Sequence, residues 1–241
     1  MFIYQELLYR PILNLLVWLY NIIPGQDLGL AIIVLTIIIR LVLYPLFHKS
    51  LKSQKELQDL KPKMDAVREK HKDNQQAQVQ ATLALYKEHK VNPLSSCLPL
   101  IVQLLVMIGL FNVLNHQLRQ AGIDGLYTFV SNPGTLEPNF LNLVNLTAPS
   151  VWLGVLAAVL QFIQAKMIQT RADWLKTRAD ATTKMLQVYM PLYYLPALTL
   201  IFAIKLPAGL PLYWVVTTLF AIMQQFIIMR KQKSESAVIA S

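Results

Sequence analysis

Apolar residues gather along this chain in five runs, each about 20 residues long and separated from the next by a more polar segment. A helix of about 20 residues rises roughly 30 Å, which matches the hydrocarbon thickness of a bilayer. The pattern therefore predicts an all-α membrane protein with five transmembrane helices. The predicted spans are residues 28–47, 96–115, 150–167, 185–204 and 209–229.

Residues 1–25 contain a further apolar run, but a shorter one. Glu6 and Arg10 leave only about thirteen largely apolar residues before the break at Pro24 and Gly25. A run of this length, with Trp18 among its residues, is typical of an amphipathic helix lying in the membrane interface. We expect such a helix here on the extracytoplasmic side, although this length leaves open whether the segment spans. No removable signal peptide or lipid-attachment motif is recognised.

The segment 48–92 is the one strongly polar block of the chain. Two sets of apolar residues recur in it at helical spacing, on either side of a polar break at 73–76, so the segment predicts a helical hairpin. The two sets are Leu57, Leu60, Met64 and Val67, followed by Val79, Leu83 and Tyr86. Ten basic and six acidic residues are mixed along the block. This mixture favours a solvated surface, with docking to a ribosome, to anionic lipid or to a partner protein as the alternative.

The positive charges predict the orientation of the chain. Of 22 lysines and arginines, ten lie in 48–92, five in or beside 168–184 and three in 230–241, whereas only three lie on the opposite side. Basic residues concentrate in cytoplasmic loops, so these three segments are expected in the cytoplasm. The amino terminus and the loop 116–147 are then outside. A net charge of +9 distributed in this way predicts a multi-pass membrane protein and no specific nucleic-acid partner.

Composition excludes several kinds of chemistry. The single cysteine, Cys97, rules out an intrachain disulfide and a multi-cysteine metal site. Neither HExxH nor GxSxG occurs, and the four histidines fall at the edges of spans or in loops. We therefore expect no metal, no cofactor and no enzymatic activity.

Arg40 interrupts the otherwise apolar run 28–47. A guanidinium keeps its proton in proteins, and placing it at the centre of a span costs about 2.5 to 3.5 kcal/mol on insertion scales. None of the five predicted spans contains Asp or Glu that could neutralise it. Two interpretations follow: Arg40 extends towards the headgroups near Phe47, or it faces a water-filled cavity within the helix bundle.

Several short motifs, taken together and in order, resemble the YidC/Oxa/Alb insertase family over residues 1 to about 231. They are TIIIRLVLYPL, LQDLKPKMDAVREKHKD, ALYKEHKVNPLSSCLPLIVQ, FIQAKM and LPAGLPLYWVVTTLFAIMQQ. Ser95 and Ser96 depart from the glycine that relatives commonly carry before the cysteine. The chain resembles the short bacterial form, which lacks a large extracytoplasmic domain.

The resemblance implies five helices around a hydrophilic groove that opens to the cytoplasm and sideways to lipid and is sealed outside. Arg40 matches the arginine on the groove wall, and Thr36, Gln164 and Trp214 match positions directed towards the groove, with Tyr213 adjacent. Each of these three has an alternative. Thr36 could bond its own backbone, Gln164 could make an interhelical contact, and Trp214 could be a packing aromatic.

The implied function is that of an insertase and chaperone for nascent membrane proteins, acting alone or beside the Sec translocon, with the ribosome and the signal-recognition-particle receptor as further partners. The substrate's apolar segment would slide along the second and fourth spans, where ordinary helix packing is the alternative role. The candidate sliding residues are Leu104, Met107, Phe111, Leu195 and Phe202. A small-molecule or ion transporter using Arg40 is the alternative function, disfavoured because the spans lack carboxylates for coupling.

Overall fold

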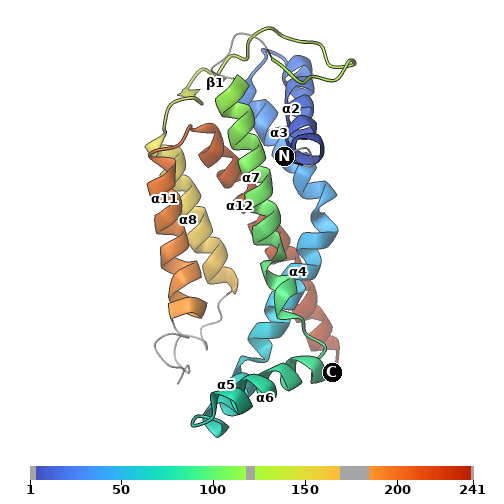
Figure 1. Cartoon of the computed structure of the whole chain (residues 1–241), viewed down its shortest axis with the longest axis vertical. Coiled ribbons are helices and arrows are strands. Elements are labelled where there is room, and N and C mark those ends of the chain that lie inside the picture. The colour runs from blue at the N-terminus through green and yellow to red at the C-terminus, as the bar shows by residue number, and fades with distance from the viewer. Residues whose placement is uncertain (1–3, 118–122, 169–184, 240–241) are drawn as a thin grey trace.

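A computed structural model describes residues 4–117, 123–168 and 185–239 of the chain. The described part is helical apart from one two-stranded antiparallel ribbon (Figure 1). The prediction of a cytoplasmic loop over 168–184 falls almost wholly outside the described residues.

The end of the molecule drawn at the top of Figure 1 is called the outer end below, and the end drawn at the bottom is called the inner end. The first half comprises η1 (Gln5–Tyr9), α2 (Arg10–Ile22), α3 (Leu28–Val42), α4 (Tyr44–Asp59), α5 (Lys61–Lys70), α6 (Gln75–Glu88) and α7 (Pro93–Gln117). The second half comprises β1 (Asn139–Phe140), β2 (Val144–Asn145), α8 (Val151–Ile168), η2 (Met185–Tyr194), α11 (Leu195–Ala203) and α12 (Gly209–Ile239).

All five apolar runs fall on helices, but they differ in length. Within α12, Gly209–Ile228 is long and apolar enough to cross a bilayer by itself, and α3 with the first part of α4 meets the same test as a bent pair. The other three, Leu100–His116, Val151–Met167 and Tyr189–Ala203, are shorter apolar helices. The structure thus confirms a mostly helical chain with a candidate span, and the number of crossings stays a prediction.

The run 28–47 is a broken helix rather than a straight one. The helix α3 ends at Val42, and α4 continues at an angle of 67° after Leu43. Pro45 explains the break, because proline lacks a backbone N–H and disfavours helical conformation in the residue before it. The bend redirects Phe47, which matters for the site described below.

The outer half of the molecule has an apolar core. One face of α2 is fully buried at Leu13, Leu16 and Val17 and packs against α3 and α7, and the start of α12 belongs to the same apolar core. The side chain of Asp27 caps α3 by accepting a hydrogen bond from the Leu30 backbone N–H at 2.8 Å. This core closes the outer end of the bundle.

The loop after α7 covers that core. The Asn14 side chain, 3 % exposed, accepts from the backbone N–H of Tyr127 at 2.6 Å and donates to the carbonyl of Gly125 at 3.1 Å. The Tyr20 hydroxyl accepts from the Glu137 N–H at 2.9 Å. Buried hydrogen bonds of this kind hold the loop against α2.

The polar hairpin forms at the inner end, where α5 and α6 pack side by side (Figure 1). Met64 and Leu60 are buried as predicted, and the Tyr86 hydroxyl lies 3.6 Å from the Met64 sulfur. The predicted use of Val79 and Leu83 is wrong, since both are more than half exposed. The buried residue of α6 is instead Leu85, and Ala77 and Ala81, which precede it at intervals of four residues, are half-buried on the same side of the helix.

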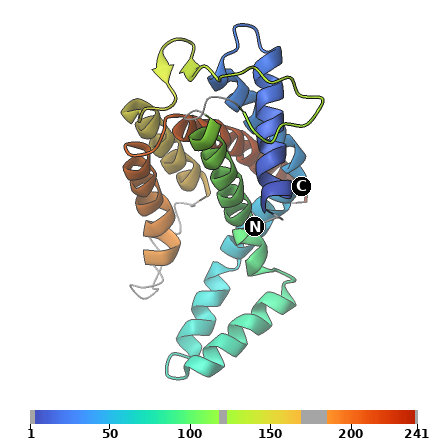
Figure 2. The same ribbon diagram turned by 45° about the horizontal axis from the view of Figure 1, so that its top comes forward.

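The helices α8, α11 and α12 form a second group. Thr199 on α11 donates to the Gln161 side chain on α8 at 2.8 Å. Closer to the outer end, a Cβ added at Gly154 would lie 2.5 Å from the Cβ of Ala203, so the two backbones approach closely there. By contrast, α7 packs mainly on α4, and no comparable packing joins it to α8 or α11 among the described residues (Figures 1 and 2).

We expect Gly154→Ala to lower the stability of the folded protein by about 1 to 3 kcal/mol, because the new methyl group overlaps Ala203. Thermal unfolding in detergent measures the effect. The double variant Gly154→Ala with Ala203→Gly makes room for the methyl group and should recover much of the loss. An equal melting temperature for Gly154→Ala and the unmodified chain would contradict the close approach.

Candidate functional site

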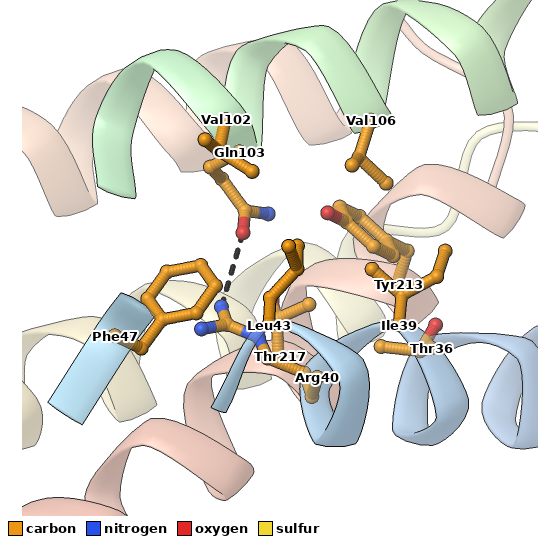
Figure 3. Close-up of a pocket in the computed structure, with 10 residues that line it drawn as sticks. All are labelled: Thr36, Ile39, Arg40, Leu43, Phe47, Val102, Gln103, Val106, Tyr213 and Thr217. Carbon is orange, nitrogen blue, oxygen red and sulfur yellow. Dashed lines mark hydrogen bonds between the residues drawn. The ribbon is translucent and has the colours of Figure 1, made fainter. Parts of the chain in front are cut away.

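Arg40 lies on the face of α3 that turns into the molecule. Only 8 % of the residue is exposed, and its side chain points towards α7 and α4 (Figure 3). The guanidinium Nη2 donates to the Gln103 side-chain oxygen at 3.0 Å. The Arg40 Cζ also lies 4.3 Å from the centre of the Phe47 ring, a distance suited to a cation–π interaction.

These contacts leave most of the guanidinium unsatisfied. Arginine carries five N–H donors, of which one is used in a hydrogen bond to the residues that the structure describes. No acidic side chain among those residues pairs with Arg40. The remaining donors are therefore available to water or to an acceptor brought by another molecule.

The guanidinium borders a small recess between α3, α4, α7 and α12 (Figure 3). Its volume of about 10 Å³ is close to that needed for one water molecule. The walls are part polar and part apolar, and they are formed by Thr36, Ile39, Arg40, Leu43, Phe47, Val102, Gln103, Val106, Tyr213 and Thr217.

Helix periodicity explains how distant parts of the sequence meet here. Thr36 and Arg40 are four residues apart on α3, as are Tyr213 and Thr217 on α12, so each pair shares one helix face. On a straight helix Phe47 would lie roughly 10 Å along the axis from Arg40. The bend at Leu43 instead brings the Phe47 ring over the Arg40 guanidinium.

Three of the five predicted groove residues line this recess: Thr36, Arg40 and Tyr213. The Thr36 hydroxyl also donates to the Ile32 carbonyl at 2.6 Å, the local bond considered as its alternative role. Gln164 and Trp214 do not line the recess; Trp214 is partly buried against the apolar core. Their role as substrate contacts stays a prediction.

Sequence reasoning missed Gln103, Thr217 and Phe47. Gln103 is the one amide in the run from Leu98 to Phe111, which is a signal that could have been read, since an isolated amide in a span needs a partner. Thr217 follows Tyr213 by four residues on α12, so helical spacing could have indicated that both lie on one face. The position of Phe47 depends on the bend and has no comparable signal.

Most of the buried polar side chains that the structure describes lie from the recess inward, and Asn14 is an exception in the outer core. Beyond Arg40 towards the inner end, Ser50 and Ser53 on α4 and two glutamines on α12 are all buried. Gln224 donates to the carbonyl of Tyr44 at 3.4 Å, whereas the neighbouring Gln225 amide is buried without a hydrogen-bond partner among the described residues. Apart from Asn14 the outer core is apolar, so buried polarity decreases along the bundle axis from the inner end to the outer end.

The candidate sliding residues divide into two groups. Leu104 on α7 and Leu195 and Phe202 on α11 are 41 to 45 % exposed. Met107 and Phe111 are partly buried against the apolar core and so take part in ordinary packing.

The chain is thus a helical protein with a candidate membrane span and a buried arginine beside a small recess inside the bundle. Comparison with known proteins identifies its family. The family model described as 60Kd inner membrane protein matches residues 18–235. A membrane protein insertase YidC from Fusobacterium nucleatum is 32 % identical, over 85 % of this chain and 87 % of that protein. Membrane protein insertase MisCA from Bacillus subtilis is 34 % identical, over 86 % of this chain and 72 % of that protein.

Larger relatives also match. A membrane protein insertase YidC from Citrifermentans bemidjiense is 34 % identical over 91 % of this chain, which spans 36 % of that protein's length. The chain belongs to the 60Kd inner membrane protein family, the YidC/Oxa/Alb family that its motifs resemble.

We expect Gln103→Leu to destabilise the protein by about 1 to 3 kcal/mol, because it leaves the buried Arg40 without its hydrogen-bond acceptor. Thermal unfolding in detergent measures the loss. The double variant Gln103→Leu with Arg40→Met removes donor and acceptor together and should be more stable than Gln103→Leu alone. Equal stability of these two variants would show that the bond between Arg40 and Gln103 contributes nothing.

Proposed function

We propose that this chain is a membrane protein insertase and chaperone of a bacterial plasma membrane, which helps nascent membrane proteins into the bilayer without enzymatic chemistry. The single observation that carries the proposal is the unneutralised Arg40 on a recess in the inner half of the bundle. The proposal is supported by relatives that carry the insertase name and that this chain matches over most of their length.

The proposed topology has five membrane crossings, with the amino terminus outside and the carboxyl terminus in the cytoplasm. The bent pair α3 and α4 would make the first crossing, followed by α7, α8, η2 with α11, and α12. In this arrangement the α5 and α6 hairpin is cytoplasmic and the β1–β2 ribbon is extracytoplasmic.

The physical problem for an insertase is the cost of moving polar peptide through hydrocarbon, where each unpaired backbone group costs several kcal/mol. A bundle that is polar inside its inner half shortens the apolar distance that a translocated segment must cross. The buried side chains from Arg40 inward would then contact water and the entering chain. The apolar outer core completes the arrangement by blocking leakage across the membrane.

Arg40 would act as a fixed attractor for the acidic end of a substrate. It is held by one amide and one ring rather than by a carboxylate, so its charge is not cancelled. The attraction has to remain weak enough for release, and a hydrated, single-cation site meets that requirement better than a closed ion pair.

Release into lipid would occur between α7 and the group formed by α8 and α11. The sparse packing between these elements supports an opening on that side. Leu104, Leu195 and Phe202, all partly exposed, would offer apolar surface to the departing segment. Cooperation with the Sec translocon, the ribosome or the signal-recognition-particle receptor belongs to the proposal as further partners.

We expect Arg40→Ala to reduce insertion of a substrate with an acidic translocated tail about five- to thirtyfold, the change that corresponds to 1 or 2 kcal/mol of lost attraction. Arg40→Lys should retain part of the activity, because charge matters more than fork geometry in a wet site. Reconstituted vesicles and protease protection of the tail provide the measurement, with a neutral-tail substrate as control. Undiminished insertion of several acidic substrates by Arg40→Ala would remove the arginine from the mechanism.

Water in the inner half can be tested with a matched pair of cysteines one helical turn apart on α3. In a Cys97→Ser background, Thr36→Cys should react with a water-soluble maleimide added from the cytoplasmic side. Ile32→Cys, in the apolar outer core, should react at least about tenfold more slowly, because a thiol there meets no water. Equal rates at the two positions would contradict a polar interior that ends at the recess lined by Thr36.

A further inference from the structure

The turn of the outer ribbon has an apolar tip. The register pairs Asn139 with Asn145 and Phe140 with Val144, which leaves residues 141–143 as the connection. Leu141 is 52 % exposed and Leu143 is 82 % exposed. Turns facing water usually carry Gly, Asn or Asp instead, so two exposed leucines need an explanation.

The backbone of this turn makes the leucines more unusual. Leu141 and Asn142 have φ angles of 51° and 56°, in the left-handed region. Asparagine tolerates this region, but leucine adopts it rarely and at a cost in free energy. The chain therefore places a large apolar side chain where glycine would be less strained.

The base of the ribbon is firmly held, so the tip has a defined position. The Asp27 side chain accepts a hydrogen bond from the Leu141 backbone N–H at 2.5 Å. The Phe140 ring packs against Gly29 at the start of α3. Leu146 is fully buried, and its carbonyl accepts from the Gly209 N–H at 3.3 Å. With its base fixed in this way, the ribbon presents Leu141 and Leu143 at the surface.

The tip belongs to a long uncharged stretch of sequence that begins well before the helix α8. No charged residue occurs from Pro138 to Ala165, yet α8 begins only at Val151. At the start of α8, Trp152 is 85 % exposed. The ribbon lies beside this outer end of α8 (Figure 2), so the exposed apolar side chains of the helix and of the tip lie on neighbouring parts of the surface.

We propose that the β1–β2 tip inserts into the extracytoplasmic leaflet, with Leu141 and Leu143 at the boundary between headgroups and acyl chains. The occupant of this surface is lipid, because the tip lies beside the exposed apolar side of α8 and residues 141–143 carry no charge. The Asp27 carboxylate beside Leu141 is already engaged by the backbone N–H groups of Leu30 and Leu141. Trp152 belongs at the same depth, since tryptophan is enriched at membrane interfaces. This tip would tie the covering loop to the outer leaflet, independently of what Arg40 does.

The test uses a fluorescent label that reports lipid contact. In a Cys97→Ser background, Leu143→Cys and Leu141→Cys are each labelled with an environment-sensitive dye, and Thr135→Cys, exposed in the same loop, is the matched control. The full chain is reconstituted in vesicles of phosphatidylethanolamine and phosphatidylglycerol containing a lipid with a quencher just below the headgroup. Labels at 143 and 141 should emit further to the blue and be quenched roughly threefold more than the label at 135.

Two results would overturn the proposal. Quenching at both tip positions no greater than at position 135 would place the tip in water. A dye at 143 that is shielded but not quenched by lipid, together with a disulfide-linked dimer of Leu143→Cys, would assign the surface to a second copy of the chain. Neither result would affect the proposed role of Arg40 in attracting the acidic end of a substrate.

Discussion

A permanent positive charge in apolar surroundings is the constraint on which this molecule depends. Arg40 cannot escape by losing its proton, and no carboxylate among the described residues neutralises it. The charge is stabilised by the Gln103 acceptor, by the Phe47 ring and by a recess with room for about one water molecule. Each of these keeps the charge tolerable without cancelling it, and this is what a transient attractor requires.

The rest of the bundle is consistent with that need. The bend after Val42 brings Phe47 over the guanidinium, and the polar side chains of α4 and α12 extend the polar interior inward. Outward of the recess, α2 and the covering loop complete an apolar core. Polarity is therefore graded along the bundle axis, which is the property that the proposed insertase mechanism uses.

The sequence predicts the helical class through its hydrophobic runs, and helical spacing places Thr36 and Arg40 on one face. The family, and Tyr213 as a neighbour of Arg40, are predicted from the resemblance of several motifs. The sequence is insufficient where tertiary packing decides. Leu85 rather than Leu83 is buried in the hairpin, and the spacing of apolar residues alone does not decide between these two stripes of the helix. The meeting of Phe47 and Gln103 with Arg40 depends on a bend and on contacts between distant helices, which periodicity does not encode.

The central claim is that the charge at position 40 attracts the translocated end of a substrate, and a charge swap tests it most directly. Arg40→Glu and the unmodified chain would each be reconstituted in vesicles without a membrane potential, with substrates that differ only in an aspartate or lysine in the tail. The account predicts that Arg40→Glu inserts the lysine substrate better than the aspartate substrate, reversing the preference of the unmodified chain. An unchanged preference for the aspartate substrate would contradict it.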